Sequence, residues 1–126
     1  MAATEHYRAA ASALANARQE KQREIDDLRH RLSQQEVDVK HSVQQMNTQM
    51  RTLEASISRT AATDNNQASG QDRSRLMQSV AQIRRTIGGT ESDFGRQRQQ
   101  IHDHIRLLEQ EVMRLDVQIR EFEMKR

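Results

Sequence analysis

The sequence contains no cysteine, no proline and no tryptophan, and it has only four glycines. Without cysteine the chain can form no disulfide and offers no thiolate for zinc binding or nucleophilic catalysis. Without proline, and with so little glycine, few positions interrupt a helix. These absences favour long helices and exclude cysteine-based chemistry.

Apolar residues are also scarce: 34% of the chain is hydrophobic and 2% aromatic, while 30% is charged. A compact core needs more apolar mass, whereas an elongated helix pair buries only one stripe per helix. No apolar run approaches the roughly 20 residues that cross a bilayer, and the first ten residues lack a signal-peptide core. We therefore expect a cytoplasmic protein with no membrane span, and signal-independent export stays open.

The net charge of +2 is too balanced to require a polyanionic partner. Arginine dominates the basic residues, with 17 Arg against 3 Lys. An arginine-rich strip between residues 73 and 106 would bind phosphates in a salt-dependent, sequence-independent way. Acidic residues of the facing arm would neutralise it, and few aromatics exist to stack on bases, so nucleic acid is the alternative partner and not the expected one. The strip comprises Arg73, Arg75, Arg84, Arg85, Arg96, Arg98 and Arg106.

Apolar residues recur at spacings of three and four in both halves of the chain, which predicts two amphipathic helices. Each of these seams contains one extra step of four, Leu32 to Glu36 and Phe94 to Arg98, and such a stutter locally unwinds a coiled coil. The predicted core residues are Tyr7, Leu14, Ile25, Leu28, Leu32, Val43, Met46, Met50, Leu53, Leu76, Val80, Ile83, Ile87, Ile101, Ile105, Leu108, Val112, Leu115, Ile119 and Phe122.

The two seams match each other when the chain is folded back on itself. Residue numbers of facing positions, such as Tyr7 with Phe122, add to 129 or 130 on both sides of the stutters. This mirror relation predicts an all-α, antiparallel coiled-coil helical hairpin that forms one domain over residues 1–126 and is oligomeric. We expect two arms of about 55 residues, over about 5–60 and 72–125, with a tip loop over about 61–71. An open linker within an intermolecular coiled coil, or a domain-swapped dimer, gives the same layers.

Three local signals refine the helix boundaries. Thr4 is a predicted N-cap, and Ser69 with Asp72 resembles a capping box at the start of the second arm. The glycine pair 88–89, followed by a Thr90-x-x-Asp93 box, predicts a kink or break over 88–90. The alternative interpretation of this pair is a hinge, or a close-approach site for another helix.

The base of the hairpin carries apolar residues outside the seam. A helix that is apolar on two faces is usually covered on both, and small alanines permit close approach of another helix. The alternative is scattered surface methionines, with alanines serving helix propensity. We predict a partner-binding surface formed by Leu107, Met113, Val117, Met124, Ala10, Ala13 and Ala17.

Two seam positions at the base, Arg18 and Lys21, carry basic residues and face Val112 and Leu108. Long basic side chains can lay their stems over apolar neighbours while the charge stays in water. We therefore expect both to belong to the seam.

No pattern in the sequence indicates catalysis. His102 and His104 are two positions apart and do not share a helix face, whereas zinc sites need three or four convergent ligands. There is no phosphate-binding glycine loop, nucleophile–base arrangement or EF-hand loop, and a thin helix pair offers no concave pocket. We expect no enzyme activity, metal or cofactor.

The predicted outline is similar to the coiled-coil hairpin stalk proteins of flagellar and type III export machinery, and to small helical-hairpin secretion substrates. The likeness is architectural, and the Trp-x-Gly turn of the secretion substrates has no counterpart here. The main hypothesis is a non-enzymatic scaffold, adaptor or spacer that self-associates or docks a helical protein partner through its base. An arginine-rich nucleic-acid binder, and a stalk or substrate of a secretion or motor assembly, are the alternatives.

Overall fold

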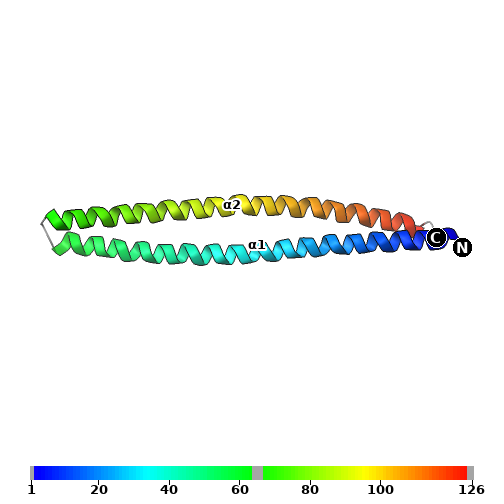
Figure 1. Ribbon diagram of the computed structural model, residues 1–126, viewed down its shortest axis with the longest axis horizontal. Helices are drawn as coiled ribbons and strands as arrows, with labels where there is room; N and C mark the ends of the chain where they lie inside the picture. Colours follow the sequence, from blue (N-terminus) through cyan, green and yellow to red (C-terminus); the bar gives the residue numbers. More distant parts are fainter. Residues whose placement is uncertain (1, 64–66, 125–126) are drawn as a thin grey trace. The chain divides into compact units, whose positions relative to one another are not determined.

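The protein is an all-α helical hairpin of two long antiparallel helices, as predicted (Figure 1). The computed structural model describes residues 2–63 and 67–124, and α1 spans Ala2–Thr63 while α2 spans Gln67–Met124. The chain divides into two compact units. Over the described residues, the base unit combines residues 2–34 with residues 97–124, and the tip unit comprises residues 35–96.

Both helices extend closer to the turn than the sequence patterns indicate. α1 continues to Thr63 and α2 begins at Gln67, so most of the predicted loop over 61–71 is helical. The capping predictions are also wrong, because Thr4 lies inside α1, which begins at Ala2, and Ser69 lies inside the first turn of α2. Alanine has the highest helix propensity, and alanines precede both Thr4 and Thr63, the last residue of α1. The predicted turn residues 64–66 lie outside the described residues.

The predicted break over 88–90 is absent, since α2 runs through Gly88 and Gly89 as uninterrupted helix. Neither glycine has a positive φ, and a Cβ added to either would meet no atom within 4 Å. The flanking seam residues Ile87 and Thr90 are half-buried. Burial of the seam thus outweighs the helix-propensity cost of about 1 kcal/mol per glycine.

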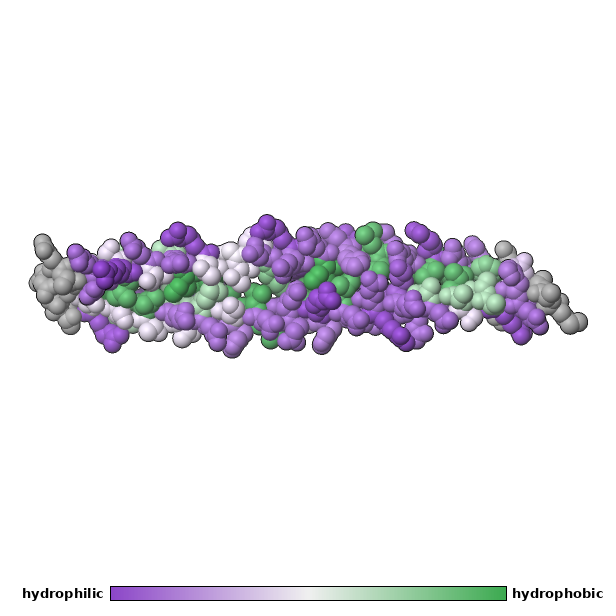
Figure 2. Space-filling view, viewed as in Figure 1, coloured by the Kyte–Doolittle hydropathy of each residue, from purple (hydrophilic) through white to green (hydrophobic). Residues whose placement is uncertain are grey.

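The base unit holds the best-packed core. Ile25 is 1% exposed and packs in one cluster with residues of α2 that lie about 80 positions away along the sequence. Nearer the helix ends, the rings of Tyr7 and Phe122 approach to a centroid distance of 5.8 Å, as the mirror relation requires. Figure 2 shows apolar side chains along the line between the helices and polar side chains on the flanks. The cluster consists of Ile25, Leu28, Ile105, Leu108 and Val112, with Ile101 packed against it.

The tip unit buries less. Among its described side chains only Val80 is buried, at 6% exposure, and the other apolar seam residues are half-buried. A row of hydroxyl side chains lies along one flank of α1 in this unit. Thr48, Thr52, Ser56 and Thr60 each donate a hydrogen bond to the backbone carbonyl four residues earlier. Such hydrogen bonds satisfy the hydroxyls within the helix and leave the unit with a thin apolar stripe.

The structure corrects the predicted stutter positions. Glu36, in the tip unit, and Arg98, in the base unit, were expected in the seam, and both are exposed. Gln35 is half-buried instead, and its amide oxygen Oε1 is buried without a hydrogen-bond partner among the described residues. The seam of α1 therefore steps from Leu32 to Gln35 and then to Val39, because a charged carboxylate is costlier to bury than an amide.

Candidate functional site: a groove and a ridge on the base unit

A shallow groove runs along one flank of the base unit between α1 and α2. Towards the helix ends it has a volume of about 550 Å³ and is lined by Ala10, Ala13 and Leu14 on α1, with Phe122 opposite. A second part, about 360 Å³, continues past Ala17 and Leu115, and Gln118 lines both parts. We call these two parts together the base groove.

The base groove exists because alanines stand where larger side chains would fill the space. Ala10, Ala13 and Ala17 follow a spacing of three and four, which places them on one side of α1. Ala10 and Ala17 are half-buried and Ala13 is exposed. Their short side chains leave Leu14, Leu115 and Phe122 accessible as an apolar floor. A groove of this kind accepts the apolar face of a helix.

One end of the base groove is closed by a charged pair. The ammonium nitrogen Nζ of Lys21 lies 2.9 Å from Oε2 of Glu111. The hydrogen bond to Glu111 and its negative charge raise the pKa of Lys21, and the same contacts lower the pKa of Glu111. Both groups therefore stay charged at neutral pH, and their charges compensate each other.

The opposite flank carries its own ion pairs. Arg18 donates from Nε to a carboxylate oxygen of Asp116, and Nη2 of Arg29 lies 2.9 Å from Oε1 of Glu109. Arg18 and Lys21 are both half-buried, with side chains 40% and 38% exposed. Their acidic partners, Asp116 and Glu111, were not predicted. The mirror relation nevertheless places each carboxylate within about one helical turn of the level of the basic residue that it pairs with.

A ridge of exposed apolar side chains lies on the outer side of α2. Met113 is 67% exposed, Val117 53% and Met124 86%. With Arg106 and Arg120 they follow the repeat of three and four along one line of the helix. We call these five residues the base ridge.

The predicted partner-binding residues thus divide between two surfaces. At 100° per residue, the base ridge lies about 130° around α2 from the groove-lining residues of the same helix. Leu107, which is 59% exposed, lies on the groove side of α2 by the same helical geometry. Ala10, Ala13, Ala17 and Leu107 therefore face one direction, and Met113, Val117 and Met124 face another.

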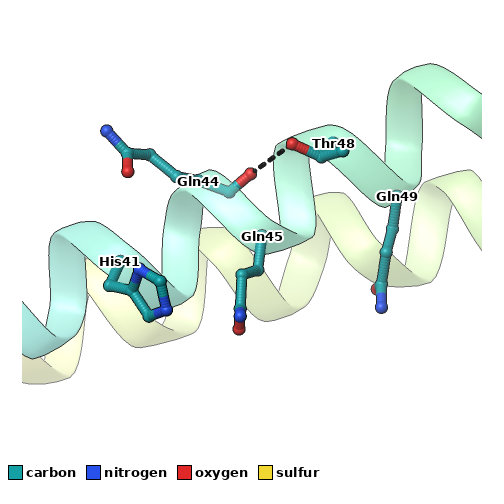
Figure 3. A pocket seen from close by; sticks show the side chains of 5 residues that line it. All are labelled: His41, Gln44, Gln45, Thr48 and Gln49. Atoms are coloured by element: carbon teal, nitrogen blue, oxygen red, sulfur yellow. Dashed lines mark hydrogen bonds between the residues drawn. The ribbon is translucent and has the colours of Figure 1, made fainter.

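A polar hollow of about 420 Å³ lies on the tip unit and is formed by α1 alone (Figure 3). His41, Gln44, Gln45, Thr48 and Gln49 line it, and the Thr48 hydroxyl donates to the Gln44 carbonyl at 3.0 Å. All five side chains are exposed. An open hollow on a single helix does not exclude water or converge reactive groups on a substrate, which catalytic pockets do.

The histidine pair of α2 does not form a metal site within the described residues. Nε2 of His104 lies 3.7 Å from Oε1 of Glu24, and His102 is exposed. No three side chains of the types that bind metals come together in the part of the chain that the structure describes.

The arginine-rich strip is partly neutralised by acidic neighbours. Arg84 lies 3.2 Å from Glu54 on α1, and Arg96 lies 2.6 Å from Asp93 on its own helix. Its members also point in several directions around α2, because Arg84 and Arg85 are 100° apart. The strip therefore does not form one continuous basic face.

The fold defines a two-helix, all-α hairpin. No family model, no curated protein and no solved structure matches the chain. Neither helix, over its described residues, contains a segment long and apolar enough to cross a membrane.

Proposed function

We propose that the protein is a non-enzymatic helical-hairpin scaffold or adaptor that docks apolar helical surfaces through its base unit. The observation that carries the proposal is the exposure of the base ridge, together with a groove on another side of the same unit that is floored by Leu14, Leu115 and Phe122. Exposed apolar patches rimmed by polar residues are typical of interaction sites. The ion pairs at Lys21 and Arg18 support the same role, because they fix the charged rims of both flanks.

Site-specific photo-crosslinking in cells of the native host tests this function. A photoreactive phenylalanine analogue would replace Met113 on the base ridge or Ala13 in the base groove. The matched control is Met77, which is 54% exposed on α2 but belongs to the tip unit. We expect protein adducts from positions 113 and 13 well above those from position 77. Equal yields at all three positions would overturn the proposed function.

A further inference from the structure

We propose that the base groove receives the base ridge of a second copy of this chain, so that parallel hairpins associate side by side with no axial shift. The inference rests on the proposed function and names its partner. Both surfaces belong to the base unit, residues 2–34 and 97–124.

The first support is a match in side-chain size. The groove alanines Ala10–Ala17 span about 10 Å along a helix that rises 1.5 Å per residue, and Met113 and Val117 lie about 6 Å apart, within that length, while Met124 lies beyond it. The small alanine side chains of the groove leave room for the larger methionine and valine side chains of the ridge. Large side chains of one helix therefore have small ones to pack against on another.

The second support is register. The contact between Tyr7 and Phe122 fixes which residues of the two helices lie at the same level. On that scale Met113 is level with Ala17, and Val117 is level with Ala13, each within about one residue or 1.5 Å. When a second hairpin lies parallel and unshifted, its ridge side chains therefore stand beside the alanines of the first.

The third support is charge. In the same register, Arg106 of the second copy is level with Glu24, which lies on α1 about one turn beyond Lys21 and whose Oε1 is 3.7 Å from Nε2 of His104. Arg120 of the second copy is level with Glu121, which lines the groove from α2. Of the basic residues that line the groove, Lys21 pairs with Glu111 at 2.9 Å, and Arg114 is level with the apolar part of the ridge and not with Arg106 or Arg120. Basic groups thus meet acidic groups at both ends of the apolar contact.

The two surfaces cannot pair with themselves in a single twofold contact, since they face directions about 130° apart on α2. The association is therefore heterologous: each copy uses its ridge towards one neighbour and its groove towards another. If neighbouring copies are not shifted along the helix axis, such an arrangement can close into a ring about an axis parallel to the helices. A constant shift between neighbours would instead give a helical filament.

Complementation between two variants tests the inference. M113E/V117E blocks the ridge and keeps the groove, while A13E/A17E blocks the groove and keeps the ridge. By sedimentation velocity we expect the wild type to associate as concentration rises, and each variant alone to sediment as a single chain of 14.6 kDa. An equimolar mixture should restore a one-to-one complex of twice that mass, because one intact ridge and one intact groove remain.

A matched control and a charge exchange sharpen the test. V37E/M77E removes two exposed apolar side chains of the tip unit and should leave the association of the wild type unchanged. R106E and E24R should each weaken association about three- to tenfold, since reversing one charge of an exposed pair replaces attraction by repulsion, and the combined variant R106E/E24R should recover most of it. Helical circular dichroism of every variant checks that the fold is kept, which is favoured because all of these positions are exposed except the half-buried Ala17.

The failures of the two proposals are distinguishable. A wild-type chain that stays monomeric at all concentrations overturns this inference, and so does association of the wild type without complementation in the mixture. In either case, adducts from positions 113 and 13 to a different protein would leave the proposed docking function standing. Without such adducts, the proposed function fails as well.

Discussion

The ammonium of Lys21 lies 2.9 Å from the carboxylate of Glu111, although Lys21 occupies a position in the apolar seam of α1. The aliphatic stem of Lys21 belongs to the seam, and its charge turns towards the groove flank. The hydrogen bond and charge of Glu111 raise the pKa of Lys21, and those of Lys21 lower the pKa of Glu111.

The Lys21–Glu111 pair is expected to stabilise the protein only within a limited range of pH. A raised lysine pKa contributes stability that is complete below the unfolded pKa of about 10.4 and is lost as pH rises through the folded pKa. A lowered glutamate pKa contributes stability above the unfolded pKa of about 4.3 that is lost as pH falls through the folded pKa. The stability difference between wild type and K21M should therefore be largest between these limits and shrink outside them.

Urea denaturation at several pH values measures that difference at fixed chain concentration. Since both side chains are more than a third exposed, solvent screens the pair and the effect is small. E111Q serves as the reciprocal variant and should reproduce the same pH window. A difference between wild type and K21M that does not vary with pH would contradict the assignment.

Gln35 at the border of the tip unit predicts a stabilising substitution. Its oxygen Oε1 is buried without a hydrogen-bond partner among the described residues, and an unsatisfied buried acceptor costs about 1–3 kcal/mol. Gln35→Leu should therefore raise the free energy of unfolding by about 1 kcal/mol. The control is Gln34→Leu, whose exposed side chain predicts little change. A loss of stability in Gln35→Leu would mean that the amide is satisfied in solution.

The uninterrupted helix through the glycine pair predicts a second pair of stabilising substitutions. Gly88→Ala and Gly89→Ala should each stabilise the protein by up to about 1 kcal/mol, because alanine favours helix and its methyl group meets no atom within 4 Å. Thermal unfolding followed by circular dichroism measures the change. Destabilisation by either alanine would reveal a close approach by another chain that the single hairpin does not contain.

Ile25 should be the most sensitive apolar position in the base unit. It is 1% exposed and central to the buried cluster, so Ile25→Ala should cost about 2–5 kcal/mol. The matched exposed control is Val37→Ala at 60% exposure, with a change within about 0.5 kcal/mol. Comparable losses in the two variants, measured by urea denaturation, would refute the packing described for the cluster.

The sequence predicts the hairpin well because its core depends on a repeat. Each predicted core residue is buried or half-buried in the structure, and Tyr7 faces Phe122 as the mirror relation requires. The helix ends, and a break at the glycine pair, were mispredicted because capping and propensity terms of about 1 kcal/mol yield to seam burial along a long helix.

The candidate site was predicted only in part. The seven partner-surface residues could be named from their off-seam positions, but not their division between a groove and a ridge. That division depends on which side of α1 the alanines occupy relative to the Met113 side of α2. The acidic partners Glu111 and Asp116 were missed because charged residues are frequent on both flanks, and spacing alone does not select one.

The contact between Tyr7 and Phe122 joins positions near opposite ends of the sequence, and this has a consequence for the route of folding. Closing a long loop costs more entropy than closing a short one, so contacts between the end of α1 and the start of α2 are available first and those of the base last. The unit with the thinner apolar stripe is therefore expected to form early, and the unit with the strongest packing completes the reaction. A chain emerging from synthesis would hold its base surfaces apart until the residues around Phe122 arrive, which delays any encounter between copies until each hairpin has closed.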